Sequence, residues 1–386
     1  MPSSVRLLAA LLVATLLAAC ASLPRPDEAV DDGTAPFGAL QLFSESSKPL
    51  VPPPGATIAG TVVPPAQPGK ELNVLAISGG GSDGAFGAGV LKGWSSSGKR
   101  PHFDIVTGVS TGALIASYAF LGTSWDPQLE HFYTRITNDQ IYQSKGLAGL
   151  FEDSLYDTTP LRSMIERAVD QRLIDAVAEE HRKGRRLYVA TTDLDTGTVA
   201  VWDMGGIAAS GHAKRLETYR DVLTASAAFP GFFKPVYVRY SDQPGKARMH
   251  VDGGVKAPIL LRSFMVEGKQ RTKNVYLLVN GKMSLKSEAP AVKATVADIS
   301  KRSIAELMRG LLYKTVYQAY VTTERAKARF NLLYVPDDVV DIADALSFKP
   351  DEMRRLFADG EKAGADPTRW AKEPPRLEPL ERVTSR

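Results

Sequence analysis

The sequence predicts an α/β fold with a mostly parallel sheet that carries helices on both faces. One observation is that short, continuous apolar runs alternate with segments of helical periodicity from about residue 70 to residue 340. Continuous apolar runs are typical of strands buried on both faces, and strands that alternate with helices favour parallel pairing. A second observation is that two of the runs pass through glycine-containing turns directly into helical patterns.

The predicted elements follow one another along the chain. The first is a buried strand over 72–78 (LNVLAIS), then a helix over 83–94, a strand over 103–110 (FDIVTGVS) and a helix over 111–122. A looser region leads into one helix over 160–184, whose apolar residues recur at three- and four-residue spacing. The later predicted elements are two strands within 185–203, a helix over 215–229, strands over 234–240, 248–254 and 274–281, a helix over 298–330 and a strand over 331–338.

Composition indicates a globular protein and gives no sign of a nucleic-acid partner. The chain has 386 residues, of which 44% are hydrophobic and 23% charged, which is ample for a core. The length allows one large α/β domain or two ordinary ones. The formal net charge is +4, and no long block of Lys or Arg occurs, so we expect no nucleic-acid binding.

The N-terminus is typical of an exported lipoprotein. Arg6 precedes an apolar run over 7–17, which is too short to span a bilayer and suits a signal peptide. Cys20 is the only cysteine, so no disulfide can form within the chain. Residues 17–20 (LAAC) resemble a bacterial lipobox, which implies a signal peptide over 1–19 and lipidation of Cys20 by acyl chains. Ala21 follows, which favours a lipid-anchored place in the cell envelope, at the outer membrane.

The remaining chain divides by composition. Residues 20–70 are rich in Pro, Gly, Ala and Ser and are predicted to be a tether. Residues 71–345 hold the alternating pattern and are predicted to be the main folded domain, to which the motifs described below belong. Residues 346–386 are predicted to be a helical or irregular extension, loosely structured at its end.

The segment 108–112 (GVSTG) predicts a nucleophile. It matches G-x-S-x-G and lies between an apolar strand and a helical pattern, which is the setting of a nucleophile elbow. Gly108 and Gly112 permit a sharp turn, and Ser110 is then held at a helix N-terminus, where negative charge is favoured. The structural alternative is a tight turn with a capping serine.

A serine nucleophile needs a base, and the histidines do not supply one. His102, His131, His181, His212 and His250 are the five histidines, and none has a convincing position in a Ser–acid–His order. Asp252 is the other candidate, since it ends an apolar strand and is followed by Gly253 and Gly254. In a parallel sheet, active groups gather at the carboxyl ends of strands. A plain Asp-Gly-Gly turn is the alternative.

Four ordered motifs together resemble the patatin-like phospholipase family. They are SGGGSDGAFGAGVLKG, GVSTGAL, TASAAFPGFFKPV and VDGGV, within roughly residues 72–282. The resemblance implies a three-layer α/β/α sandwich and a lipid acyl hydrolase with a Ser–Asp dyad. Ser110 is then the nucleophile and Asp252 the base, and the glycine loop with Gly79, Gly80, Gly81 and Gly84 forms the oxyanion hole.

Two features of the motifs carry further expectations. Asp83 stands where many members of the family carry Arg or Lys, which puts a preference for anionic phospholipids in doubt; we expect its side chain to point away from the site. Ser226 lacks flanking glycines, so it is not a second nucleophile. Phe229, Phe232 and Phe233 either form an acyl pocket or pack in the core.

Two other functions compete with a membrane-lipid hydrolase. Gly79, Gly81 and Gly84 also fit the dinucleotide fingerprint G-x-G-x-x-G, but the next strand does not end in the acidic residue that binds ribose. A non-catalytic envelope lipoprotein of the same fold, acting in interaction or lipid binding, is the second alternative. No cofactor or metal is predicted, because no His/Cys grouping has ligand spacing. The lipid head group, the acyl length, calcium dependence and the oligomeric state stay open at this stage.

Overall fold

A computed structural model describes most of the chain beyond residue 68. The described residues are 28, 39–40, 64, 69–239, 245–266, 272–283, 291–339 and 346–375. The predicted signal peptide with Cys20 and most of the predicted tether therefore lie outside the described residues, as do residues 376–386 of the predicted extension. None of the described helices combines the length and the apolar character that crossing a bilayer requires.

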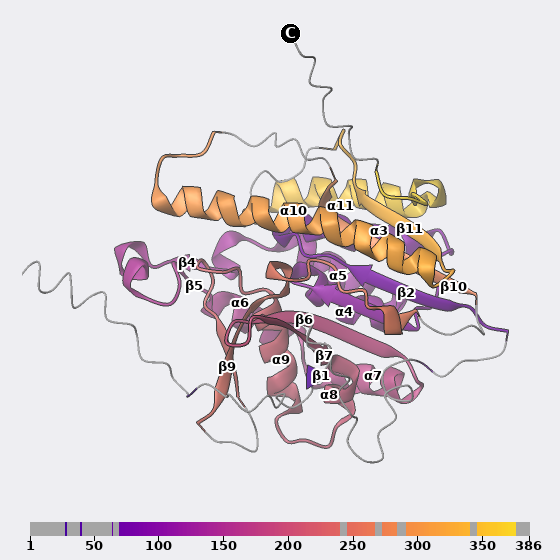
Figure 1. Cartoon of the computed structure of the whole chain (residues 1–386), viewed down its shortest axis with the longest axis horizontal. Coiled ribbons are helices and arrows are strands. Elements are labelled where there is room, and N and C mark those ends of the chain that lie inside the picture. Colours follow the sequence, from indigo (N-terminus) through magenta and orange to yellow (C-terminus); the bar gives the residue numbers. More distant parts are fainter. Residues whose placement is uncertain are drawn as a thin grey trace, which may run out of the picture.

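A central sheet of nine strands organises the described part of the chain (Figure 1). Its main path runs β1-β7-β6-β3-β2-β10-β11, and β9 pairs with both β6 and β8. Neighbouring strands from β6 to β11 on this path are parallel, and the remaining pairs are antiparallel. The strands are β1 (Ala39–Leu40), β2 (Leu72–Ile77), β3 (Ile105–Val109), β6 (Arg186–Asp193), β7 (Thr198–Asp203), β8 (Val236–Arg239), β9 (Ala247–Asp252), β10 (Lys273–Lys282) and β11 (Arg329–Val335). The predicted mostly parallel α/β sheet is confirmed.

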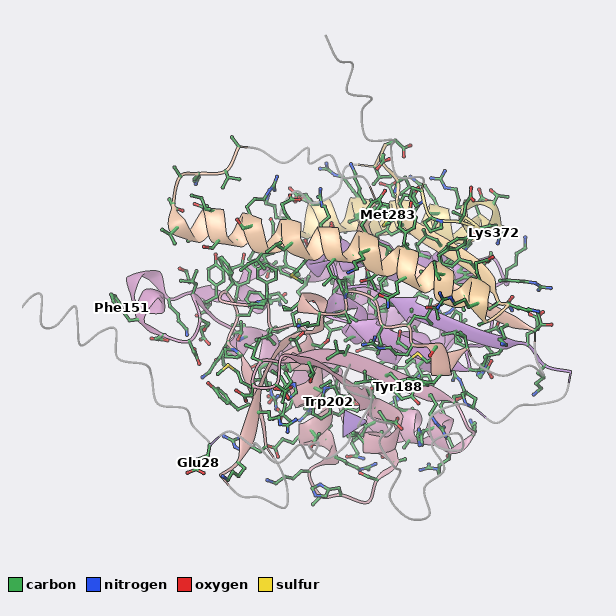
Figure 2. The ribbon with its side chains drawn as sticks, in the orientation of Figure 1. Glu28, Phe151, Tyr188, Trp202, Met283 and Lys372 are labelled. Atoms are coloured by element: carbon green, nitrogen blue, oxygen red, sulfur yellow. The ribbon has the colours of Figure 1, made fainter. Side chains whose placement is uncertain are left out.

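The apolar runs form strands because both faces of the sheet are buried. Leu75 and Ile77 of β2 belong to the core on one face, and Val74 and Ala76 belong to the core on the other. A strand covered on both sides needs apolar residues at every position, which explains the missing alternation. Burial is less complete at the antiparallel end of the sheet, where β7 begins with the exposed Thr198 but includes the fully buried Trp202 (Figure 2).

Helices cover the two faces unequally. The first core joins the sheet to most of the helices, and the second joins it to the segment 253–266 and to one long helix, α10, which crosses the sheet in Figure 1. The helices are α3 (Gly84–Ser96), α4 (Thr111–Leu121), α5 (Asp126–Arg135), α6 (Thr159–Ala168), α7 (Gln171–Arg182), α8 (Met204–Ala209), α9 (Arg215–Ser226), α10 (Val296–Arg325) and α11 (Pro350–Ala365). The result is a layer of helices, a sheet, and a thinner layer dominated by α10.

Two of the predicted helices have different bounds. The single helix predicted over 160–184 is two helices, because Asp170 has an extended backbone and caps α7 with a 2.8 Å bond from Leu173 N–H. The helix predicted over 298–330 ends at Arg325, and Lys327 adopts a left-handed φ of 54° just before β11. The hydrophobic periodicity of the sequence continues past residue 170 and past residue 325. The helices end there because of the local backbone conformation, which periodicity does not indicate.

Helices α3 and α11 touch backbone to backbone. A Cβ on Gly89 would lie 2.0 Å from a carbonyl oxygen of α11, and one on Gly93 would lie 1.9 Å from another. Likewise, a Cβ on Gly360 or Gly364 of α11 would lie 2.2 or 2.1 Å, respectively, from a carbonyl oxygen of α3. Paired glycines four residues apart allow this approach because they present no side chain. The C-terminal helix is thereby packed onto the helix that follows the glycine loop.

Candidate active site

Ser110 lies in a strained turn between β3 and α4. Its φ is 55° and its ψ is −127°, a conformation that costs a residue with a Cβ about 1–3 kcal/mol. The flanking glycines let the turn close: a Cβ on Gly108 would lie 2.3 Å from the carbonyl oxygen of Gly112. A Cβ on Gly112 would lie 2.4 Å from the carbonyl oxygen of Ser78. The turn presents a serine that is 8% exposed at the start of a helix.

Asp252 meets Ser110 because of the pairing register along β6. Strand β3 pairs with β6 as far as Val109, which lies opposite Ala190. The next residue of β6, Thr191, lies opposite Asp252 of β9. Strand β9 therefore takes over the sheet position where β3 stops, and the two strands meet end to end at Ser110 and Asp252. Asp252 ends its strand as predicted, and this strand, β9, runs antiparallel to β6 within the mostly parallel sheet.

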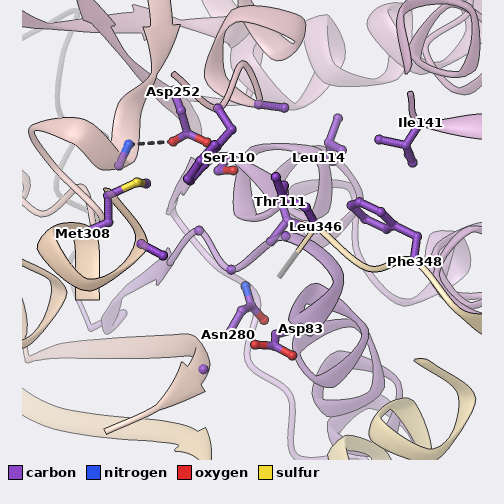
Figure 3. A pocket seen from close by; sticks show the side chains of 18 of the residues that line it. Asp83, Ser110, Thr111, Leu114, Ile141, Asp252, Asn280, Met308, Leu346 and Phe348 are labelled. Carbon is purple, nitrogen blue, oxygen red and sulfur yellow. Dashed lines mark hydrogen bonds between the residues drawn. The ribbon is translucent and has the colours of Figure 1, made fainter. Parts of the chain in front are cut away.

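The Asp252 carboxyl group is buried beside the serine (Figure 3). Burial raises its pKa from 3.8 to about 6, because the charged form loses solvation. Two hydrogen bonds to the carboxylate lower the pKa in opposition to burial. One comes from Ser110, and the other comes from the Gly254 N–H, whose nitrogen lies 2.7 Å from Oδ1. The group is ionised at neutral pH, so it is able to accept a proton from the serine hydroxyl.

Ser226, which the sequence analysis set aside, braces the turn. It is fully buried, and its hydroxyl accepts a 2.9 Å hydrogen bond from the Ser110 N–H. The same hydroxyl donates to the Ala190 carbonyl oxygen at 2.8 Å. Ser226 thus ties the nucleophile turn to β6. The motif TASAAF includes this position, but the partner lies 116 residues away along the chain, so no local pattern indicates the contact.

The glycine loop between β2 and α3 lies directly against the serine. A Cβ on Gly79 would lie 3.1 Å from the Cβ of Ser110. Gly80 has a φ of 156°, and a Cβ there would lie 2.1 Å from the carbonyl oxygen of Asn280. The loop is therefore confined between the nucleophile turn and β10, and a side chain at Gly80 would collide with backbone.

Two of the four predicted oxyanion-hole glycines have a backbone N–H that is already engaged. The Gly79 N–H donates to the Pro258 carbonyl oxygen at 3.3 Å, and the Gly84 N–H donates to carbonyl oxygens of the preceding turn, including that of Gly81. Among the described residues, the N–H groups of Gly80 and Gly81 have no hydrogen-bond acceptor. Gly80 and Gly81 are thus the loop positions whose donors are available to a ligand.

Ser110, Asp252 and the glycine loop line one cavity of about 360 Å³. Most of the side chains that line it are apolar. They include Leu114, Phe132, Ile136, Ile141, Leu161, Met164, Phe229, Phe233, Leu312, Leu346, Phe348 and Met353. Of the three aromatic residues in the predicted acyl pocket, Phe229 and Phe233 line the cavity, whereas Phe232 packs in the core. An apolar cavity beside a serine suits an acyl chain.

Asp83 lines the same cavity (Figure 3). The direction of its side chain relative to Ser110 stays a prediction. Asp83 is 7% exposed and lies at the start of α3, where negative charge is favoured. The acid thus contributes to the polar part of the cavity wall.

Helix α10 closes one side of the cavity, which the sequence pattern does not indicate. Six of its residues line the cavity at helical spacing: Arg302, Ala305, Glu306, Met308, Arg309 and Leu312. Hydrophobic periodicity identified the helix but not the neighbours of each face.

Histidine takes no part in the cavity wall. None of the five histidines lines it. His250 is buried in β9, where its Nδ1 lies 2.9 Å from Thr191 Oγ1, and burial lowers its pKa to about 4. In the described part of the chain, no three His, Cys, Asp or Glu side chains are grouped so that they could hold a metal ion.

A family model matches this geometry. Residues 75–265 match the model of the patatin-like phospholipases. That range contains the glycine loop, Ser110, Ser226 and Asp252, and the resemblance noted from the motifs is confirmed. No curated protein matches the chain in a sequence comparison.

Two solved structures are similar in arrangement at low identity. The crystal structure of VipD from Legionella pneumophila has 11% identity and a TM-score of 0.37, covering 75% of this chain and 67% of that chain. The heterodimeric complex ExoU–SpcU from the type III secretion system of Pseudomonas aeruginosa has 13% identity and a TM-score of 0.28, covering 64% of this chain and 52% of that chain.

Proposed function

We propose that this chain, whose residues 75–265 belong to the patatin-like phospholipase family, is a serine hydrolase that cleaves acyl esters of membrane lipids. The observation that carries the proposal is the end-to-end meeting of β3 and β9, which brings the Ser110 hydroxyl to the Asp252 carboxylate. Both groups line an apolar cavity that suits an acyl chain.

The first half of the reaction acylates the serine. As Ser110 Oγ attacks the ester carbonyl carbon, Asp252 takes the hydroxyl proton. The carbonyl oxygen becomes an oxyanion, which receives hydrogen bonds from the N–H groups of Gly80 and Gly81. In comparable enzymes one such donor contributes about 3–4 kcal/mol. When the tetrahedral intermediate collapses, Asp252 returns the proton to the leaving alcohol, and the acyl group stays on Ser110.

The second half releases the fatty acid. A water molecule takes the place of the alcohol, and Asp252 accepts its proton as the oxygen attacks the acyl-enzyme carbonyl. Collapse of the second intermediate breaks the ester to Ser110, and the proton returns to the serine oxygen. The raised pKa of Asp252 makes it a stronger base than an ordinary carboxylate, which favours both proton transfers.

The anchoring part of the proposal rests on the sequence. Lipidation of Cys20 would hold the enzyme at a membrane surface of the bacterial envelope, with residues 20–70 as the tether. A Cys20→Ser variant that is expressed in its bacterial host is expected to lose palmitate labelling and to leave the membrane fraction. Retention of the label in that variant would contradict the assignment.

The central test uses purified protein on a panel of lipids. The wild type is expected to release fatty acid, with products identified by mass, whereas Ser110→Ala is expected to be inactive with an unchanged circular dichroism spectrum. A fluorophosphonate probe should label the wild type at Ser110. Turnover that persists in Ser110→Ala would overturn the assigned nucleophile. Absence of both labelling and turnover in the wild type would favour the non-catalytic lipoprotein.

A further inference from the structure

One face of α10 forms the cavity wall next to the base. The lining residues from Arg302 to Leu312 recur every three or four positions and therefore lie on one side of the helix. Met308 packs against the turn that follows the base. Its Cε lies 2.6 Å from the position that a Cβ on Gly254 would take. Gly254 in turn donates to the Asp252 carboxylate. The wall that carries Arg309 is thus packed against the dyad itself.

Arg309 is a cation of this wall with an unused donor. Its Nη1 is buried and has no hydrogen-bond partner among the described residues. The acid one turn before it, Glu306, is paired instead with Arg302, with 3.1 Å between Nε and Oε1. Arg309 lines the cavity, and no hydrogen bond or ion pair engages its guanidinium among the described residues, so its positive charge is able to pair with an anionic ligand there.

The other basic groups of the wall are occupied. Arg302 is held by Glu306, and the Lys282 ammonium donates to the Asp337 carbonyl oxygen at 3.2 Å. Among the described residues that line the cavity, Arg309 is thus the cation left to bind an anionic group.

We propose that Arg309 binds the phosphate of a phospholipid whose ester carbonyl lies at Ser110. A guanidinium fork matches two phosphate oxygens, and the partly apolar surroundings strengthen the pairing. This inference rests on the proposed function and assigns a specificity-determining residue to it. Arg309 selects lipids that carry a phosphate over neutral acylglycerols, and it acts on binding and orientation, because it takes no part in proton transfer.

The test compares two substrates that differ in the phosphate. Phosphatidylcholine and diacylglycerol with the same acyl chains are offered at the same mole fraction in neutral detergent micelles, so that the surface charge is constant. Arg309→Gln is expected to lower kcat/KM for phosphatidylcholine at least about tenfold and to leave diacylglycerol within about twofold. Arg325→Gln, at the exposed C-terminal end of the same helix, is the matched control and is expected to change neither.

A binding measurement keeps the inference testable without turnover. Calorimetry with a short diether phosphatidylcholine, which has no ester to cleave, is expected to give a Kd at least about tenfold weaker for Arg309→Gln than for the wild type. The corresponding diether glycerol, which has no phosphate, is expected to bind both equally. If neither ester substrate is hydrolysed, the proposed function fails, and this comparison alone decides the role of Arg309.

Several outcomes would overturn the role of Arg309. Equal losses on both substrates would assign it a structural role. Equal binding of the diether phospholipid by the wild type and Arg309→Gln would show that Arg309 does not contact the phosphate. Hydrolysis of diacylglycerol but not of phosphatidylcholine by the wild type would refute the substrate class and leave the acyl hydrolase intact. Inhibition by inorganic phosphate, with equal phosphatidylcholine turnover in both proteins, would assign the site to a free anion.

Discussion

The hydroxyl of Ser226 lies 2.9 Å from the backbone nitrogen of Ser110 and accepts its hydrogen bond. The same hydroxyl donates to Ala190 of β6, so one side chain joins the nucleophile turn to the sheet. A turn with a positive φ persists only when its surroundings fix it. This contact makes Ser226 a positioning residue for the reaction.

The Ser226→Ala variant is therefore expected to be slower and less stable. It leaves the buried Ser110 N–H without its acceptor, which costs about 1–3 kcal/mol of unfolding free energy. Because misplacement of a nucleophile is costly, kcat is expected to fall about ten- to hundredfold with little change in KM. Ser117→Ala is the matched control, since it removes a buried 2.8 Å contact with Tyr219 outside the cavity and should lower stability alone. Equal kcat values for Ser226→Ala and the wild type would contradict the positioning role.

The pKa of Asp252 sets the expected pH dependence of activity. The carboxylate acts as base only when ionised, and burial raises its pKa to about 6. The value of kcat/KM, which reports on the free enzyme, is expected to rise with pH and to level off above pH 6. Below that pH it should fall about tenfold per pH unit. A soluble p-nitrophenyl ester followed from pH 4.5 to 8 would reveal the profile, and a midpoint near the ordinary aspartate pKa of about 4 would contradict it.

The same shift predicts that Asp252→Asn stabilises the protein while abolishing activity. Since the pKa of Asp252 is higher in the folded protein than in the unfolded chain, the folded state holds the proton more tightly between pH 3.8 and about 6. Stability therefore falls as pH rises through that interval, and the full loss is present above it. At about 1.4 kcal/mol per pKa unit the loss is on the order of 3 kcal/mol.

Urea unfolding of Asp252→Asn and the wild type at two pH values measures this effect. At pH 7.5 the variant is expected to be the more stable protein, and at pH 4 the difference should be small. A variant that is less stable than the wild type at pH 7.5 would contradict this prediction. It would show that the hydrogen bonds of the Asp252 carboxylate stabilise the fold by more than its desolvation destabilises it.

The contact between α3 and α11 predicts a pronounced effect of one methyl group. In Gly93→Ala the new Cβ would lie 1.9 Å from the carbonyl oxygen of Glu361, so the two helices must separate. Overpacking of this kind costs about 1–3 kcal/mol and lowers Tm. Gly310→Ala is the control, since it makes the same change within helix α10 with nothing within 4 Å. There, improved helix propensity should raise stability by up to about 1 kcal/mol. Similar Tm changes in both variants would contradict a close approach at Gly93.

The sequence predicted features that depend on neighbours along the chain. The apolar runs identified the buried strands, and the turn at Ser110 followed from glycines two residues on either side of it. The place of Asp252 at a strand end and the family resemblance both indicated it as the partner, and the fold brings the two residues together. Features that depend on distant neighbours were missed. The antiparallel direction of β9, the contact of Ser226 and the cavity face of α10 all arise from pairings that periodicity does not encode.

The fully buried residues of helix α10 all lie toward one of its ends. Its buried residues, Val316, Ala319 and Thr323, all lie in the C-terminal half, and no residue over 296–315 is buried. The stretch that faces the dyad thus contributes little to the folding free energy, because substitutions away from the core are usually mild. Natural variation can therefore reshape what the cavity admits without destabilising the domain. If the proposed function holds, substitutions in this one wall would change which lipids are accepted while Ser110, Asp252 and the sheet stay as they are.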